Sequence, residues 1–191
     1  NIRTIFNHIN PYSNIPLDVK TFIKEHKHLY LNYSAEYLKK ARSGTNEAQM
    51  VHGDLNFGNA LISCTNKEYP VLIDFEDSLF SWLPPQVDLA FFLERFLILK
   101  KIDDDKKVEW AQTLLEQYAS STGQFPFCFV DELEKTLKFL SIRALGRLCL
   151  NAKDRINSSE DEWQKFIDLY KRSSQLSDLI ASFTLPFLSK Y

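Results

Sequence analysis

One stretch constrains this chain more than any other part of its sequence: VHGDLNFGNALI, at residues 51–62. It places His52, Asp54 and Asn59 around two glycines and then continues into apolar residues. Because glycine permits tight turns and close approach of the backbone, the pattern predicts a shaped loop that leads into a strand. A second apolar run ends in an acid at Asp74, which predicts a neighbouring strand with a carboxylate at its end.

The rest of the chain is predicted to be mostly helical, because five glycines and seven prolines are few for 191 residues. Apolar residues recur at three- and four-residue steps after an entry segment at residues 1–16. The expected helices cover residues 17–42, 86–101, 103–121, 131–148 and from 159 until Pro186. Short strands are expected at residues 61–62 and 71–73. The predicted fold is mainly α with a small β-hairpin insert, an α+β arrangement in one domain.

The polar residues of the loop and the second strand suit phosphoryl transfer. An acceptor hydroxyl must be oriented and must lose its proton, which a carboxylate such as that of Asp54 can accept. The charge of the phosphates must be neutralised by Mg²⁺, which prefers oxygen ligands, and Asn59 and Asp74 offer an amide oxygen and a carboxylate. Protein kinases divide the work in the same way, with one loop aspartate as base and an asparagine and a second aspartate on metal. A phosphotransferase centre is therefore the leading hypothesis.

Simpler interpretations exist for each residue taken alone. Asp54 and Asn59 are common in turns, Asp74 could cap the end of a strand, and a lone histidine such as His52 is more often structural than a ligand. A zinc site is disfavoured because no second histidine lies at helical ligand spacing. A P-loop is excluded because Gly58, the second glycine of a Gly-x-x-x-x-Gly spacing, is followed by Asn-Ala and not by Lys and Ser or Thr.

Three motifs in order resemble the aminoglycoside phosphotransferase/choline kinase superfamily, which is protein-kinase-like. HGDLNFGN at residues 52–59 is similar to its H-G-D-x-x-x-x-N catalytic loop. IDFE at residues 73–76 is similar to its counterpart of the protein-kinase DFG segment, and VDLA at residues 87–90 to a D-L-A motif that follows. The resemblance implies magnesium-dependent transfer of the γ-phosphate of ATP or GTP to a small-molecule hydroxyl, with amine-bearing molecules among the candidate acceptors. Glu76, at the end of the second motif, is a further candidate for the metal, with a solvent-facing carboxylate as the alternative.

The resemblance also assigns roles to individual residues. It implies that Asp54 is the catalytic base and that Asn59 and Asp74 bind magnesium. His52 and Asp88 would support the site structurally. Taken alone, Asp88 could equally be an acid in the first turn of its helix. No substrate-binding residue is assigned.

The resemblance implies that residues 1–191 form a single helical, kinase-like C-terminal lobe. Residues 1–49 would be an entry segment and a helix, residues 50–90 the catalytic loop, short strands and metal-binding segment, and residues 91–191 a helical bundle. The family's N-terminal lobe, with its β-sheet, phosphate-covering loop and lysine, has no counterpart here. We therefore expect the chain to be inactive alone and to dimerise through the face that this lobe would cover. The alternative is a non-catalytic pseudokinase or partner-binding module.

Composition narrows the remaining classes of partner. A formal net charge of −2 gives no basic excess to hold a nucleic acid or an anionic membrane surface. No run of about 18 apolar residues predicts a membrane span. The three cysteines are odd in number and widely spaced, which favours free thiols in a reducing compartment over a disulfide framework. We therefore expect a cytoplasmic protein whose partners are a nucleotide and a small molecule.

Overall fold

The computed structural model describes residues 2–42, 49–63, 70–75, 82–83, 86–97, 102–122, 127–154 and 156–188. Its helices are α1 (Ile2–Asn7), α2 (Leu17–Arg42), α3 (Gln86–Leu97), α4 (Asp104–Thr122), α5 (Phe127–Lys153) and α6 (Glu160–Leu188). Its strands are β1 (Gln49–Met50), β2 (Ala60–Leu61), β3 (Val71–Leu72) and β4 (Trp82–Leu83), and a 3₁₀ turn, η1, covers Phe57–Asn59. The predicted class, mainly α with a small β insert, is confirmed. None of the described helices is long and apolar enough to cross a membrane.

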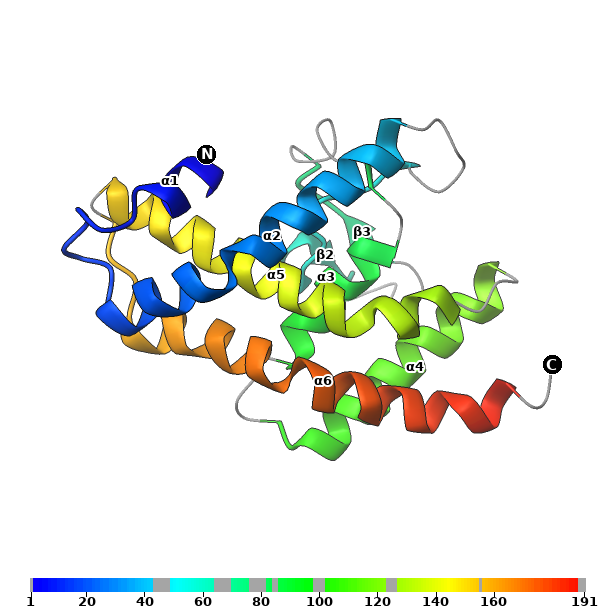
Figure 1. Cartoon of the computed structure of the whole chain (residues 1–191). Coiled ribbons are helices and arrows are strands. Elements are labelled where there is room, and N and C mark those ends of the chain that lie inside the picture. The colour runs from blue at the N-terminus through cyan, green and yellow to red at the C-terminus, as the bar shows by residue number, and fades with distance from the viewer. Residues whose placement is uncertain are drawn as a thin grey trace.

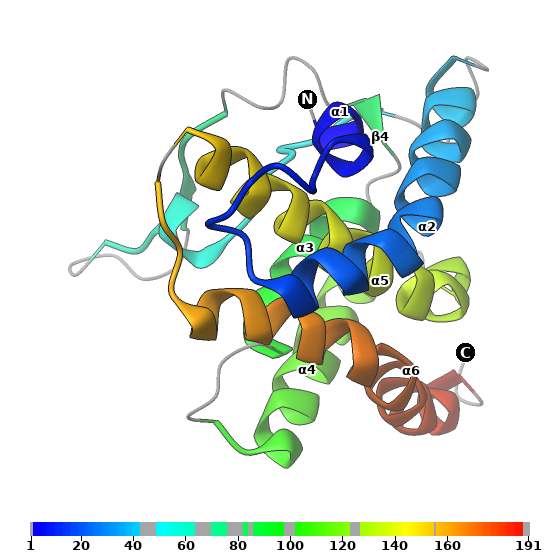
Figure 2. The same cartoon turned by 60° about the vertical axis from the view of Figure 1, so that its left-hand side comes forward.

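Helix α5 forms the middle of the molecule and packs against α1, α2, α3 and α6. Figure 1 shows it running between α2 and α6, and Figure 2 shows the same arrangement from another side. Its buried side chains serve two hydrophobic clusters. Leu133, Leu137 and Leu140 join a cluster with α3 and α4, while Leu145 and Cys149 join one with α1, α2 and α6. A helix that is covered on several sides must be apolar around much of its circumference, which the leucine-rich sequence of α5 provides.

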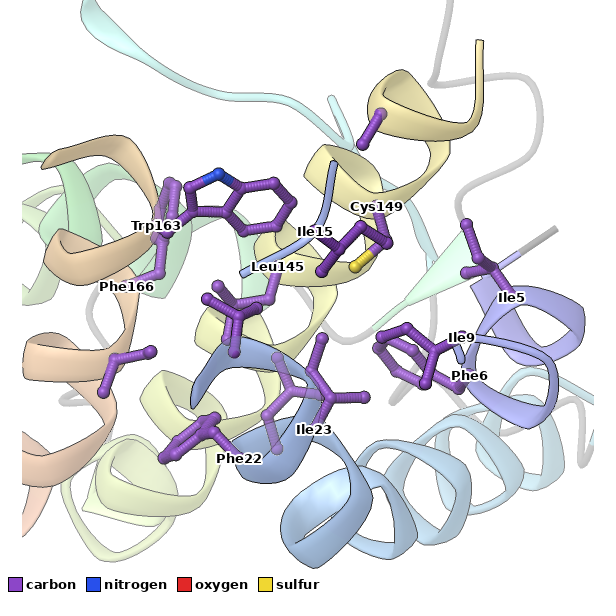
Figure 3. Packing of buried hydrophobic residues seen from close by; sticks show 14 of the residues in the cluster. Ile5, Phe6, Ile9, Ile15, Phe22, Ile23, Leu145, Cys149, Trp163 and Phe166 are labelled. Atoms are coloured by element: carbon purple, nitrogen blue, oxygen red, sulfur yellow. The ribbon is translucent and has the colours of Figure 1, made fainter. Parts of the chain in front are cut away.

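The second cluster, shown in Figure 3, brings together side chains from α1, α2, α5 and α6. Ile5 and Phe6 of α1 are buried there. The approach of α1 to α5 is closest at Gly146, where an added Cβ would lie 2.5 Å from Cγ2 of Ile2 and 3.0 Å from the Phe6 ring. The sequence does not predict α1, because a helix of six residues has little stability of its own and depends on packing of this kind.

Two small antiparallel ladders frame the loop of residues 51–59. β2 pairs with β3, with Ala60 opposite Leu72 and Leu61 opposite Val71, which confirms the predicted hairpin. β1 pairs with β4 in a second ladder, which the sequence does not predict. Since β1 comes directly before the loop and β4 shortly precedes α3, this pairing brings the start of the loop to the start of α3.

Both predicted ends of α2 and the predicted start of α4 are confirmed. α2 covers residues 17–42, and α4 begins within the acidic run at residues 103–105. At that point the Asp103 carboxylate accepts a hydrogen bond from the Lys106 backbone N–H at 2.9 Å. This contact satisfies one of the N–H groups that a first helical turn leaves without an intrahelical partner.

Other helix ends differ from the prediction, among them both ends of α5, which continues to Lys153 and not only to residue 148. α5 begins at Phe127, earlier than the predicted start at Asp131. The preceding residue in the sequence is a proline. A helix start tolerates proline because the backbone N–H that proline lacks would have no intrahelical partner there. α6 continues to Leu188, beyond Pro186. That proline removes one hydrogen bond close to the helix end and leaves the remaining bonds of α6 in place. The turns expected around Gly44, at residues 65–67, at 84–85 and between 123 and 126 lie outside the described residues, as does the segment 98–101.

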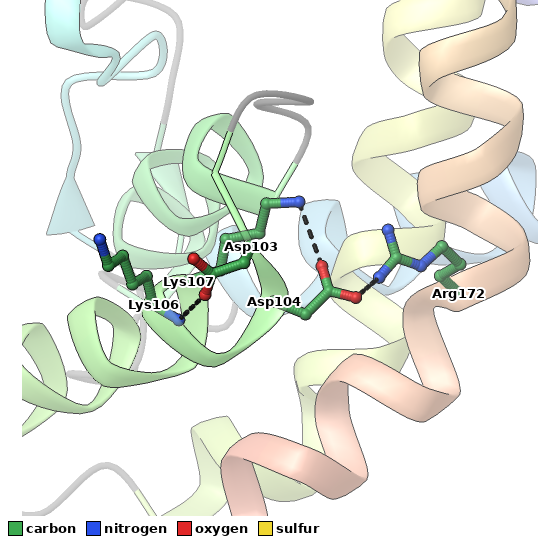
Figure 4. Close-up of polar contacts among 5 residues, drawn as sticks. All are labelled: Asp103, Asp104, Lys106, Lys107 and Arg172. Atoms are coloured by element: carbon green, nitrogen blue, oxygen red, sulfur yellow. Dashed lines mark hydrogen bonds and ion pairs between the residues drawn. The ribbon is translucent and has the colours of Figure 1, made fainter.

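The first turn of α4 is tied to α6 by a surface ion pair. Figure 4 shows Asp104 between Lys107, whose Nζ lies 3.2 Å from Oδ1, and Arg172, which donates a hydrogen bond to Oδ2. The hydrogen bond from Arg172 lowers the pKa of Asp104 below its usual value. Because the Asp104 carboxylate is 47% exposed, the pair contributes only about 0.5 kcal/mol to folding.

Candidate active site around the catalytic-type loop

The backbone of the loop is fixed by one carboxylate from α3. Asp88, in the first turn of α3, accepts a hydrogen bond from the His52 N–H at 2.7 Å on Oδ2 and from the Gly53 N–H at 3.0 Å on Oδ1. Because His52 and Gly53 are buried, these two N–H groups need a protein partner, and Asp88 supplies it. The positive end of the helix dipole of α3 favours a negative charge at this position.

Both glycines of the loop occupy places that a side chain would disturb. Gly53 has a φ of 84°, a left-handed conformation that suits glycine and gives the predicted turn beside Asp54. At Gly58 an added Cβ would lie 3.0 Å from Oδ1 of Asn56, and this oxygen accepts a hydrogen bond from the Gly58 N–H at 2.8 Å. The loop therefore turns at Gly53 and closes on itself at Gly58.

Asn59 ties the two ends of the loop together. Its buried side chain donates a hydrogen bond from Nδ2 to the Asp54 carbonyl oxygen at 2.9 Å. Its backbone N–H donates to the Asn56 carbonyl oxygen at 3.0 Å. With Nδ2 engaged in this way, Oδ1 is the acceptor end of the amide, and an oxygen of this kind is what a hard cation binds.

The end of β3 lies against the loop. The Ile73 N–H donates to the Asn59 carbonyl oxygen at 2.9 Å. His52 Nε2 lies 2.9 Å from the Ile73 carbonyl oxygen, which makes Nε2 the protonated donor nitrogen of this ring. The His52 ring also packs on Phe75, with 4.6 Å between ring centroids. His52 thus joins the loop to the segment that carries Asp74.

Asp74 has an unusual backbone conformation. Its φ is 65°, and among the described residues it is the one non-glycine residue with a positive φ. A left-handed conformation costs a residue with a side chain roughly 1 kcal/mol, and aspartate tolerates it better than most residues. Strained backbone conformations cluster at active sites and ligand clamps. The sequence carries no signal that would have revealed this conformation.

An oxygen donor set that suits Mg²⁺ is present at Asn59 and Asp74. Mg²⁺ commonly takes only one or two protein oxygens and completes its shell with water and phosphate, so an amide oxygen and an exposed carboxylate fit it. Among the described residues, no group of three His, Cys, Asp or Glu side chains is placed to share a metal, which gives a zinc site no support. The contacts above bring the predicted loop and strand-end residues into one region. Glu76 lies outside the described part of the chain.

A cavity of about 390 Å³ opens beside Asp54. The loop contributes Asp54 to its wall, α3 contributes Phe91, and α5 contributes Arg143 and Arg147. The start of α6 adds Lys165. The sequence alone does not assign these cationic residues to the site, because their spacing does not tell which face of α5 opens toward the loop.

A larger hollow of about 760 Å³ lies elsewhere, between α2 and α6. His26 and Tyr170 line it, and their rings are 4.6 Å apart. It holds none of the predicted site residues, so the smaller cavity at Asp54 is the one that bears on the chemistry.

Comparison with known proteins agrees with the motifs. The model of the phosphotransferase enzyme family, APH, matches residues 21–127, more than half of the chain, including the loop, both ladders and α3. Neither a curated protein nor a solved structure gives a significant match. The extent of the family match decides the assignment: the chain belongs to the phosphotransferase enzyme family.

Proposed function

We propose that the protein transfers the γ-phosphate of a nucleotide, ATP or GTP, to a hydroxyl of a small molecule, in the manner of aminoglycoside and choline kinases. One observation carries the proposal. The loop of residues 52–59 is hydrogen-bonded to the end of β3 through both Asn59 and His52, so the residues proposed for proton transfer and metal binding belong to one connected unit.

In this proposal Asp54 acts on the acceptor. Its carboxylate borders the 390 Å³ cavity, where a small molecule can present a hydroxyl to it. The hydroxyl oxygen forms a bond to the γ-phosphorus while the bond from that phosphorus to the oxygen of the departing nucleoside diphosphate breaks. The hydroxyl proton passes to the Asp54 carboxylate. Asp54 thus both orients the acceptor and removes its proton.

Asn59 and Asp74 would hold the metal in this proposal. When bound, Mg²⁺ neutralises charge on the phosphates and helps to orient them. The hydrogen bond from Asn59 Nδ2 to Asp54 keeps the amide oxygen turned away from the loop backbone. Asp88 accepts from the loop backbone and His52 Nε2 donates to the Ile73 carbonyl oxygen, so we propose that these two residues position the loop and do not take part in the reaction.

The test of this function is phosphoryl transfer in the longest natural protein that contains this chain. Asp54→Asn should lower kcat by about a hundredfold or more, which is what a general base contributes. Asp74→Asn should weaken binding of the magnesium nucleotide, and Asp178→Asn, an exposed aspartate of α6, serves as the matched control. Transfer is followed by nucleoside diphosphate release over a panel of hydroxyl compounds. A near-normal rate in Asp54→Asn would remove the proposed mechanism.

A second candidate function is a non-catalytic module that binds a partner. It is favoured by the β2–β3 hairpin, whose apolar side chains are exposed, with 52% of Leu61, 67% of Ile62 and 61% of Val71 open to solvent. A surface of this kind is commonly covered by another domain or chain. The same assay distinguishes the two functions. If the protein is a non-catalytic module, the longest natural protein should neither bind magnesium nucleotide nor transfer phosphate.

A further inference from the structure

The geometry points to an acceptor that carries an anionic group, either a carboxylate or a phosphate monoester. This group binds to Arg143, Arg147 and Lys165 while the acceptor hydroxyl faces Asp54. The inference rests on the proposed function for the role of Asp54, and it goes further by naming the chemical class of the acceptor.

The cationic wall of the cavity comes from one stripe of α5. Arg143, Arg147 and Asn151 are spaced four residues apart, which places them one above another on the same face of the helix. Arg143 is half-buried, and its guanidinium lies 5.1 Å from the centroid of the Phe91 ring of α3. This contact helps to orient the Arg143 side chain. Arg147 is exposed, at the open side of the same cavity.

Helix α6 completes the wall. Lys165 lies with its Nζ 5.0 Å from the centroid of the Phe166 ring and 4.0 Å from Oε1 of Glu162. Among the described residues, the lining of the cavity therefore has three cations and two acids, namely Glu162 and Asp54. Counted as formal charges, these five side chains carry a net charge of +1. This contrasts with the whole chain, whose formal net charge is −2.

The charge and the lining together favour an anion over a cation. An arginine guanidinium binds carboxylate and phosphate through paired, charge-assisted hydrogen bonds. Phe91, Leu140 and Phe166 line the same cavity and lower the local dielectric constant, which strengthens such contacts. An ammonium group in the same place would be repelled by two arginines. The volume, about 390 Å³, suits a compound of small size.

The inference is tested by equilibrium binding, without nucleotide, to the longest natural protein that contains this chain. Four probes share a three-carbon hydroxylated skeleton and differ in charge: glycerate, glycerol 3-phosphate, glycerol and 3-aminopropane-1,2-diol. Titration calorimetry, or amide shifts in NMR spectra of the labelled chain, should show at least one of the two anions binding about tenfold or more tightly than glycerol and the amine. The stronger of the two anions identifies carboxylate or phosphate as the preferred group.

Variants locate the binding. Arg147→Gln should weaken binding of the preferred anion about threefold, since its charge is exposed, and Arg143→Gln with Arg147→Gln about tenfold or more. Lys135→Gln removes one exposed positive charge from the same helix, outside the cavity, and should leave the affinity unchanged. If the double variant unfolds, Arg147→Gln with Lys165→Gln replaces it, because both of those side chains reach solvent.

Three results would overturn the inference: no binding of either anion, equal or tighter binding of the amine, or anion binding that the cavity variants leave unchanged. Failure of the proposed function looks different. If the anion binds as expected but Asp54→Asn retains full transfer in the longer protein, the catalytic proposal falls and the preference of the cavity stands. If transfer depends on Asp54 but favours the amine, the preference falls and the catalytic proposal stands.

Discussion

Asp88 gives the sharpest test of how the loop is held. Its two carboxylate oxygens accept hydrogen bonds from the adjacent N–H groups of His52 and Gly53, at 2.7 and 3.0 Å. Asp88→Ala removes both acceptors at once and leaves two buried donors without them. Asp88→Asn keeps the shape and one acceptor oxygen, but it turns an NH₂ group toward the second N–H.

The expected cost follows from these contacts. A hydrogen bond to a charged group contributes about 1.5–3 kcal/mol, and a buried donor left unsatisfied costs about 1–3 kcal/mol. Asp88 is partly exposed, so water reaches some of the site, and the lower part of these ranges applies. We expect Asp88→Ala to lower the free energy of unfolding by about 2–4 kcal/mol and Asp88→Asn by about half as much. For a chain of this size the first loss corresponds to a fall in Tm of roughly 10 °C.

Urea denaturation followed by circular dichroism measures both losses, and Asp178→Ala, an exposed aspartate within α6, is the control, with an expected change within about 0.5 kcal/mol. Hydrogen exchange at the amides of His52 and Gly53 should also accelerate in Asp88→Ala relative to the control. The reasoning is wrong if Asp88→Ala unfolds at the same urea concentration as the wild type, or if Asp88→Asn is the more damaging of the two.

Three further outcomes follow from the packing and the charges. Gly146→Ala should lower the free energy of unfolding by about 1–3 kcal/mol despite alanine's better helix propensity, and adding Ile2→Ala should recover part of the loss in the same denaturation assay. Burial raises the pKa of Cys149 to about 12, so at pH 8 iodoacetamide should label it more than a hundredfold faster in urea than in the native chain, as peptide mass mapping would show. Arg172→Gln should cost about 0.5 kcal/mol at pH 7, and the difference should vanish as pH falls through the lowered pKa of Asp104, because a carboxyl with a depressed pKa stabilises the fold only while ionised. Equal losses at pH 7 and at a pH low enough to protonate Asp104 would contradict the last of these.

The sequence predicts those parts of the fold whose signals are local. The helix over residues 17–42 shows apolar residues at helical steps along its whole length, and the β2–β3 hairpin shows two apolar runs around a polar turn. The loop was predictable because its two glycines, with Asp54 and Asn59 at their spacing from His52, predict a shaped turn that leads into a strand. Each of these signals lies within one short segment and needs no knowledge of the remaining chain.

The parts that the sequence does not predict depend on contacts between distant segments. Helix α1 packs closely against Gly146 of α5, which lies far from α1 in the sequence. β1 and β4 are two residues each and become strands only by pairing with one another. The left-handed conformation of Asp74 depends on what surrounds it, and the place of Arg143 and Arg147 beside Asp54 requires the packing of α5 against α3 and α6.

Helix α5 has a buried side and an exposed side, and the two sides differ in how well they tolerate substitution. Leu137, Leu140 and Leu145 point into the interior, where any alteration in volume is felt by several neighbours at once. Arg147 and Asn151, on the exposed side, can be exchanged without disturbing that interior. A lineage could therefore change the charge and shape of the cavity beside Asp54 by replacing a few outward side chains, while the inward leucines keep α5 packed against its neighbours.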